Sequence, residues 1–345
     1  MNRKNAANIL AGAAMALMPS LLAAQPLPAT APVEPKLAAA PKLTIRNGLL
    51  TATIYTPAEG AFYSGTRFDR SGVVGSLTLG GQEYYGAWFQ RTGDDIRDFI
   101  HTPEGIAAGP NTAIMGPVEE FGAIGYDTTP VGGRFLKIGV GMLNKPDAQP
   151  YSAFRLYEVA DAGRWTVART MNSVTMTQTV GGSSGYRYVK TLRLVPGKPQ
   201  LVIEHVLRNT GSQPIATNVY NHNFVTMDPG NGNTAVDLAF EPAQPARPSL
   251  TVTGKRITWT KPLVDRDSAS MLTNDEKTPA RPYDVTVTNL KTGAAIKVVS
   301  AEPMTRMNLW SIRTVNAAEP YVAVNVAPGG ETRWSYTYTY TAPHS

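Results

Sequence analysis

His222 has the surroundings best suited to proton transfer among the four histidines of this 345-residue chain. It follows a β-rich run at 201–207 and a turn that begins at Asn209, so we expect it on the second strand of a hairpin, between Asn221 and Asn223. A histidine can give or accept a proton near neutral pH, and the amide of Asn221 can orient its ring or bind a substrate hydroxyl. The local sequence leaves a second interpretation open, in which the histidine is buried and hydrogen-bonded to a carbonyl group.

Another set of residue types suits chemistry on an acidic sugar. Arg67 and Lys137 can neutralise the carboxylate of a uronate while a base such as His222 or Tyr126 removes the neighbouring proton, which is the reaction of a polysaccharide lyase. The adjacent carboxylates at 119–120 are a candidate pair for glycoside hydrolysis. Because neighbouring residues of a strand point to opposite faces, those two carboxylates do not converge easily on one bond.

The elements that must position these residues are strands. Nearly every interpretable segment from residue 42 onward has a period of two, most clearly at 334–340, where aromatic residues alternate with hydroxyl residues. Turns rich in Gly, Pro and Asn separate the segments, and the sequence shows no amphipathic helix or repeat of fixed length. The pattern predicts an all-β fold, one large antiparallel sandwich or barrel. We expect irregular loops at 92–133 and 228–249, and a solvated acidic loop at 94–98.

The N-terminal segment and the composition of the chain predict an exported globular protein. Arg3 and Lys4 precede an apolar stretch that ends in small residues, so 1–24 is expected to be a signal peptide. The Pro- and Ala-rich residues 25–41 are expected to be a tether, followed by a single domain at 42–345. The chain has no cysteine, which excludes disulfides and thiolate chemistry.

The charge and the N-terminal segment also indicate which partners and which location to expect. A net charge of +6 without any run of Lys and Arg does not predict a nucleic-acid partner. We expect a monomer in the periplasm or the medium that is free of the membrane once the signal peptide is removed.

The segment 201–222 resembles the aldose 1-epimerase, or galactose mutarotase, family, in which a strand, a polar turn with Pro and a strand ending in Asn-His present the catalytic acid. The order of residues at 310–331 is also similar, and 66–70 resembles the N-terminal arginine motif of the family. The resemblance extends over 43–345. The segment 116–143 departs from the pattern of the simple sugar epimerases, which points to a divergent, exported branch.

The resemblance implies a large antiparallel β-sandwich that binds a mono- or oligosaccharide, without a cofactor or metal. His222 would protonate the ring oxygen and Glu319 would take the proton of the anomeric hydroxyl, with the two groups on opposite sides of the sugar. His101 is the available counterpart of the second histidine of the family. The residues expected to bind the substrate are Arg67, Asn221, His101, Glu120, Tyr126, Lys137 and Trp310.

Three functions are therefore predicted as alternatives. The first is acid–base chemistry of the aldose 1-epimerase kind on a sugar ring. The second is a polysaccharide lyase or glycosidase that acts on an acidic glycan. The third is a carbohydrate-binding protein without catalytic activity.

Overall fold

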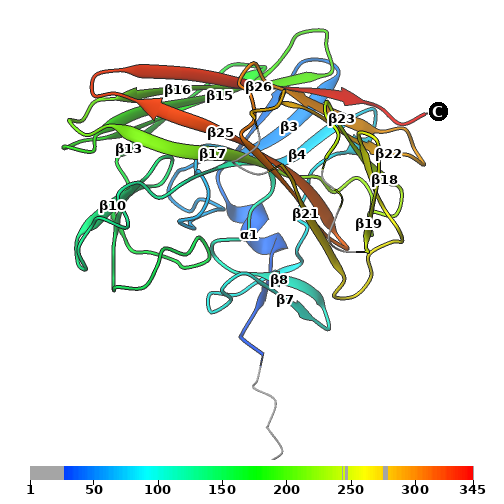
Figure 1. Ribbon diagram of the computed structural model, residues 1–345, viewed down its shortest axis with the longest axis horizontal. Coiled ribbons are helices and arrows are strands. Elements are labelled where there is room, and N and C mark those ends of the chain that lie inside the picture. Colours follow the sequence, from blue (N-terminus) through cyan, green and yellow to red (C-terminus); the bar gives the residue numbers. More distant parts are fainter. Residues whose placement is uncertain (1–26, 243, 245–247, 275–278, 345) are drawn as a thin grey trace, which may run out of the picture.

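The computed structural model describes residues 27–242, 244, 248–274 and 279–344, and almost all of their regular structure is β (Figure 1). The prediction of an all-β sandwich built from antiparallel sheets is confirmed. The expected signal peptide at 1–24 lies outside the described residues. Within those residues, no helix is long and apolar enough to span a bilayer.

The largest sheet of the described chain, called the large sheet here, has the order β13-β14-β15-β16-β26-β23-β22-β18-β20-β19. It curves over the rest of the molecule in Figure 1. Its antiparallel strands are β13 (Arg164–Arg169), β14 (Ser173–Val180), β15 (Tyr186–Leu194), β16 (Gln200–Asn209), β18 (Thr234–Leu238), β19 (Leu250–Thr253), β20 (Arg256–Trp259), β22 (Asp284–Asn289), β23 (Ala295–Val299) and β26 (Glu331–Thr341).

A second sheet packs beneath the large one and has the order β21-β24-β25-β17-β9 (Figure 1). We call it the second sheet. Its strands are β9 (Gly116–Phe121), β17 (Ile215–Phe224), β21 (Ser268–Asn274), β24 (Arg306–Ile312) and β25 (Val315–Val326). All of its pairs are antiparallel.

Smaller elements complete the structure. Helix α1 and the hairpin β7–β8 lie on the side of the second sheet that faces away from the large sheet (Figure 1). The elements are β1 (Ala31–Pro32), α1 (Glu34–Ala39), β2 (Lys42–Arg46), β3 (Leu50–Tyr55), β4 (Val73–Leu79), β5 (Gln82–Glu83), β6 (Arg91–Thr92), β7 (Phe99–Thr102), β8 (Gly105–Ala108), β10 (Arg134–Lys137), β11 (Gly141–Asn144) and β12 (Val159–Asp161).

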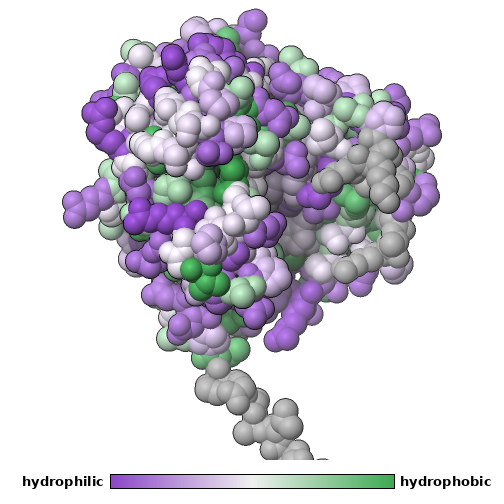
Figure 2. Space-filling model, turned by 60° about the vertical axis from the view of Figure 1, so that its left-hand side comes forward, coloured by the Kyte–Doolittle hydropathy of each residue, from purple (hydrophilic) through white to green (hydrophobic). Residues whose placement is uncertain are grey.

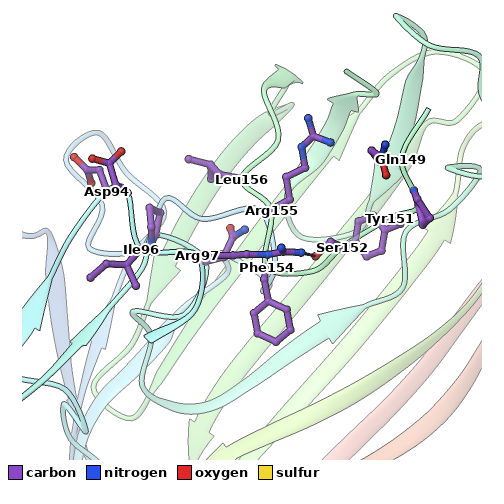
Figure 3. A pocket seen from close by; sticks show the side chains of 13 residues that line it. Asp94, Ile96, Arg97, Gln149, Tyr151, Ser152, Phe154, Arg155 and Leu156 are labelled. Carbon is purple, nitrogen blue, oxygen red and sulfur yellow. Dashed lines mark hydrogen bonds between the residues drawn. The ribbon is translucent and has the colours of Figure 1, made fainter. Parts of the chain in front are cut away.

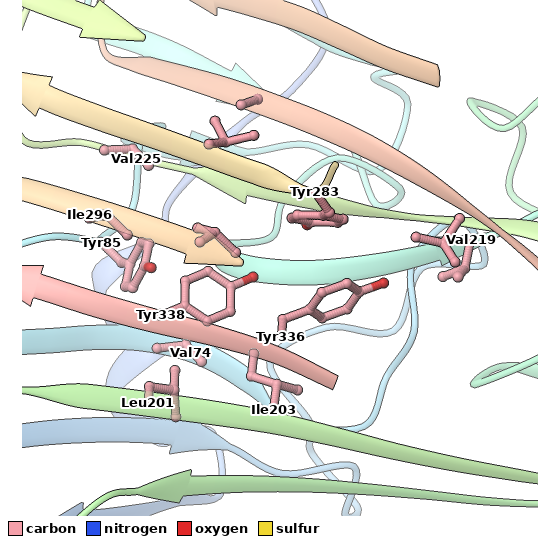
Figure 4. Packing of buried hydrophobic residues seen from close by; sticks show 14 of the residues in the cluster. Val74, Tyr85, Leu201, Ile203, Val219, Val225, Tyr283, Ile296, Tyr336 and Tyr338 are labelled. Atoms are coloured by element: carbon pink, nitrogen blue, oxygen red, sulfur yellow. The ribbon is translucent and has the colours of Figure 1, made fainter. Parts of the chain in front are cut away.

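The aromatic alternation at 334–340 builds the core between the two sheets. Tyr336 and Tyr338 of β26 have no exposed surface and lie beside Ile203 of β16, with Val219 of the second sheet nearby (Figure 4). Burying a large apolar side chain contributes about 1.5–3 kcal/mol. The aromatic row is therefore a packed sheet face, as its period of two predicts.

A buried cluster of charged groups also joins the two sheets. Lys190 of β15 forms an ion pair with Glu119 of β9, and its ammonium group lies 3.5 Å from a carboxylate oxygen of Asp69. His205 of β16 lies 3.0 Å from the other oxygen of Glu119, and all four side chains are fully buried. Burial opposes the charge of Glu119, but the Lys190 ammonium and the His205 ring outweigh it and lower the pKa of Glu119.

Two expectations about irregular segments are wrong. The supposed tether is structured over 31–40, where β1 pairs with β6 and α1 begins beside a proline, because Val33 and Ala40 are buried in a hydrophobic cluster. The expected loop at 92–133 contains β9, a strand of the second sheet. That strand is buried on both faces, so its sequence lacks the polar alternation of a half-exposed strand.

Replacing Lys190 tests whether the buried charges hold the sheets together. The K190M variant should lose about 3–5 kcal/mol of unfolding free energy, because Glu119 and Asp69 remain buried without the ammonium group of Lys190. The matched control is K297M, since Lys297 pairs with Asp284 at 3.0 Å but is half exposed and should cost below about 1 kcal/mol. Urea denaturation measures both, and equal small losses would contradict the interpretation.

Candidate functional site

The register between β17 and β25 brings together the two residues expected to be catalytic. The strands pair without a shift over Ile215–Tyr220, and the bridge at Val225 continues the same register. His222 therefore stands directly opposite Glu319, although 96 residues separate them in the sequence. Nε2 of His222 lies 3.2 Å from Oε1 of Glu319, close enough for one proton to bridge them.

Polar and aromatic side chains form rows across one face of the second sheet. Because every second residue of a strand points to the same face, paired residues on β9, β17, β25 and β24 lie side by side. The rows, given in that strand order, are Glu120, Tyr220, Tyr321 and Arg306 in the first, His222, Glu319 and Asn308 in the second, and Phe224 and Trp310 in the third.

These rows form the floor of a cavity of about 210 Å³. The side chains of His222 and Glu319 are 5% and 7% exposed, so both are nearly shielded from bulk water. The residues that line the cavity are Arg67, Asp98, Thr112, Phe154, Tyr220, His222, Phe224, Asn308, Trp310, Glu319 and Tyr321. The prediction that the acid and base lie on opposite sides of a sugar is wrong, because the paired strands hold His222 and Glu319 side by side.

Arg67 closes one side of the cavity and is held by several partners. Its Nε donates to Glu120 at 2.6 Å, and its Nη2 donates to the hydroxyl of Tyr220 at 3.0 Å. The guanidinium carbon lies 4.7 Å from the centre of the Phe154 ring. Behind this group the buried Lys137 lies 3.9 Å from the second oxygen of Glu120, and burial lowers its pKa to about 8. The carboxylate of Glu120 thus already has two cations as partners.

Burial moves the pKa values of His222 and Glu319 in opposite directions. It raises the pKa of Glu319 to about 7, although the charge of Arg67 and a hydrogen bond from Asn308 partly oppose this. Burial, with a contribution from the charge of Arg67, lowers the pKa of His222 well below its ordinary value. Near neutral pH the imidazole is neutral and the carboxyl group is poised between its two forms. The pair can therefore both give and take a proton.

The structure separates the other predicted residues into three groups. Arg67 and Trp310 line the cavity, whereas Glu120 and Lys137 lie behind Arg67. Asn221 does not line the cavity, so the expectation that it binds the substrate is corrected. It is next to His222 in the strand and points to the opposite face, where its Nδ2 donates to Glu119 at 3.1 Å and its Oδ1 accepts from Tyr338.

Tyr126 and His101 also lie outside the cavity. Tyr126 is buried in a separate aromatic cluster, and its hydroxyl donates to the carbonyl of Gln149 at 2.9 Å. His101 lies on β7 and lines a different cavity together with Arg266 and Arg313. The structure therefore does not bring either residue together with His222 and Glu319, contrary to expectation.

Several lining residues were not predicted from the sequence. Asp98 belongs to the loop that was expected to be solvated, yet it is partly buried, accepts a hydrogen bond from Thr112 at 3.0 Å, and has a pKa raised by burial. Asn308 donates to Glu319 at 3.2 Å from the neighbouring strand. Asn308 could have been predicted, because residues two apart on a strand point to the same face and Trp310 was already a candidate. No local feature of the sequence indicates Asp98.

The described residues contain no group of three or more His, Cys, Asp or Glu side chains arranged to hold a metal ion. No family model matches the sequence, and no curated protein matches it either. Comparison with solved structures does find relatives of the fold. A galactose mutarotase-like protein from Lactobacillus casei matches with a TM-score of 0.52 and 13% identity over 87% of this chain and 100% of that one.

Further solved structures give the same result. A galactose mutarotase related enzyme from Lactobacillus acidophilus has a TM-score of 0.50 and 12% identity, covering 88% of this chain and 99% of that one. A galactose mutarotase-like protein from Clostridium acetobutylicum has a TM-score of 0.50 and 10% identity, covering 87% and 95%. The chain has the galactose mutarotase-like fold. The fold implied by the sequence resemblance is confirmed, while identities this low leave the activity to be argued from the site.

The raised pKa of Glu319 predicts a pH-dependent cost in stability. Between pH 4.5, the ordinary pKa of a glutamate, and about pH 7, the folded protein binds more protons at Glu319 than the unfolded chain does. The free energy of unfolding therefore falls as the pH rises through this range. The stability of E319Q relative to the wild type should rise by about 3 kcal/mol over that range. Urea denaturation at pH 4.5 and pH 8 measures it, and a difference that does not change with pH would contradict the assignment.

Proposed function

We propose that this protein interconverts the anomers of a neutral sugar, as an aldose 1-epimerase does. The observation that carries the proposal is the contact between the buried His222 and Glu319 on the floor of a cavity of about 210 Å³. We also propose that it acts outside the cytoplasm, because 1–24 has the features of a signal peptide.

The side-by-side pair suits a sugar that presents one edge of its ring. In a pyranose the ring oxygen and the anomeric hydroxyl are bonded to the same carbon, so adjacent acid and base groups can reach both. One group removes the hydroxyl proton while the other protonates the ring oxygen, the bond between that oxygen and the anomeric carbon breaks, and an open-chain aldehyde forms. Rotation of the aldehyde and reversal of both transfers close the ring with the opposite anomer and restore the pair.

The acid and base roles can be assigned to His222 and Glu319 in two ways, and in both of them the pair carries one proton. In the assignment that the family resemblance implies, His222 carries it and Glu319 is the base. In the reverse assignment Glu319 carries it, which agrees with the raised pKa of its carboxyl group and the lowered pKa of His222. Because the two forms differ only in where the proton lies, the reaction needs the pair with one proton in either case.

The charges around Arg67 favour a neutral sugar over a uronate. A lyase needs free cations to neutralise the carboxylate of its substrate. Here Arg67 and Lys137 both interact with Glu120, and Lys137 is fully buried. Trp310 and Phe154 line the cavity and provide apolar contacts for the C–H groups of a sugar.

Anomer exchange followed by NMR on a panel of aldohexoses and aldopentoses tests the proposal. The wild type should accelerate exchange, and H222Q or E319Q should each lower kcat/KM by at least about 100-fold, because each removes one of the two proton-transfer groups. E204Q is the matched control, since Glu204 is a half-exposed carboxylate on the large sheet.

The outcomes separate the predicted functions. Wild-type exchange that H222Q and E319Q leave unchanged would overturn the proposed roles of both residues. Retention of sugars without any exchange would support the non-catalytic binding protein. New absorbance from an unsaturated uronate, with acidic polysaccharides as substrates, would support the lyase.

A further inference from the structure

A second and larger cavity adjoins the one that contains His222 and Glu319. It has a volume of about 700 Å³, and Phe154 lines both cavities. Figure 3 shows Asp94 and Ile96 on one side and Gln149 and Tyr151 on the other, with Phe154 between them. The larger cavity lies at the surface, since its lining residues Asp94, Arg97 and Leu156 are exposed. Figure 2 shows one face of the molecule, on which hydrophilic residues predominate and hydrophobic ones occur in small groups.

The two cavities are connected by contacts as well as by position. Phe154 is stacked on Arg67, which lines the smaller cavity, with 4.7 Å between the ring centre and the guanidinium carbon. Tyr151 lines the larger cavity, and its hydroxyl accepts a hydrogen bond from Lys137 at 3.2 Å. Lys137 in turn lies 3.9 Å from Glu120, the ion-pair partner of Arg67. A ligand that spans both cavities would therefore contact Phe154, Tyr151 and Arg67. The buried Lys137 and Glu120 connect the last two from behind.

The volumes suggest how a ligand is divided between the cavities. Pockets that bury a complete small ligand usually measure about 300–1,000 Å³. The smaller cavity, at about 210 Å³, falls below that range and suits a single ring, whereas the larger one falls within it.

The lining of the larger cavity suits a neutral ligand with many hydroxyl groups. Asp94 and Asp95 balance Arg97 and Arg155, so the cavity has no excess of either charge. Arg97 donates to the hydroxyl of Ser152 at 3.0 Å across the cavity.

Asn111 gives an independent indication of a ligand. It lines the larger cavity and is 1% exposed. Its Oδ1 accepts from the amide of Thr66 at 2.7 Å, but its Nδ2 has no hydrogen-bond partner among the described residues. A buried amide group without a partner is costly, and a ligand oxygen would satisfy it once the side chain turns toward the cavity.

We propose that the larger cavity binds the second and third units of a neutral oligosaccharide whose reducing-end unit occupies the smaller cavity. The inference rests on the proposed function, because only the reducing end has the anomeric hydroxyl that His222 and Glu319 would act on. The proposed substrates are oligosaccharides with a free reducing end.

Kinetics with paired substrates test this subsite. The probes are reducing trisaccharides with α-1,4, β-1,4 and β-1,3 linkages, each compared with its own monosaccharide by NMR measurement of anomer exchange. At least one trisaccharide should show kcat/KM about tenfold above that of its monosaccharide. L156W should remove this advantage by raising KM for the trisaccharide, while kcat/KM for the monosaccharide stays unchanged. Equal kcat/KM for all pairs, or equal losses for both substrates in L156W, would overturn the inference.

A matched control and a binding measurement keep this inference separate from the proposed function. Leu290 is as exposed as Leu156, at 52% and 53%, but lines neither cavity, so L290W should keep the trisaccharide advantage. Calorimetry with the same trisaccharides reduced to alditols removes the anomeric chemistry. Binding by the wild type that L156W weakens about tenfold supports the subsite even if no anomer exchange occurs. Absence of binding by every alditol and every trisaccharide would overturn it.

Discussion

The contact between His222 and Glu319 depends on the register of two neighbouring strands, and the rest of the site depends on that contact. Antiparallel pairing fixes which residues of β17 and β25 stand opposite each other, and a slip by one residue would turn every functional side chain to the other face. The same pairing places Asn308 beside Glu319 and Glu120 beside Tyr220. Strand register therefore positions the polar groups more firmly than loops could.

The two faces of the second sheet have different roles because its residues alternate. On one face Asn221 joins Glu119 in the buried charged cluster that links the sheets. On the other face His222 lines the cavity. Adjacent residues thus serve stability and chemistry separately. The buried carboxyl group of Glu319 lowers stability at alkaline pH, which is a cost commonly found where a protein holds a group ready to transfer protons.

The sequence predicted the fold better than the site, for a physical reason. Half-exposed strands such as β26 show a period of two, which predicts the sandwich. In contrast, β9 is buried on both faces and shows no such period, so its sequence predicts a loop. The local sequence already marks His222, whereas Glu319 follows only from the family resemblance. Asp98 and Phe154 were not found because long-range packing alone brings their loops to the cavity, and the opposite faces of His222 and Asn221 show that nearness in sequence does not imply a shared site.

The dependence of kcat/KM on pH tests most directly the claim that His222 and Glu319 act through one shared proton. Anomer exchange, corrected for the uncatalysed rate, would be measured by NMR from pH 5.5 to pH 9. Because burial raises the pKa of Glu319 to about 7, kcat/KM should fall as pH rises through that value, approaching a tenfold loss for each further pH unit. A kcat/KM that rises through the same range would mean that the proton is not needed and would contradict the claim.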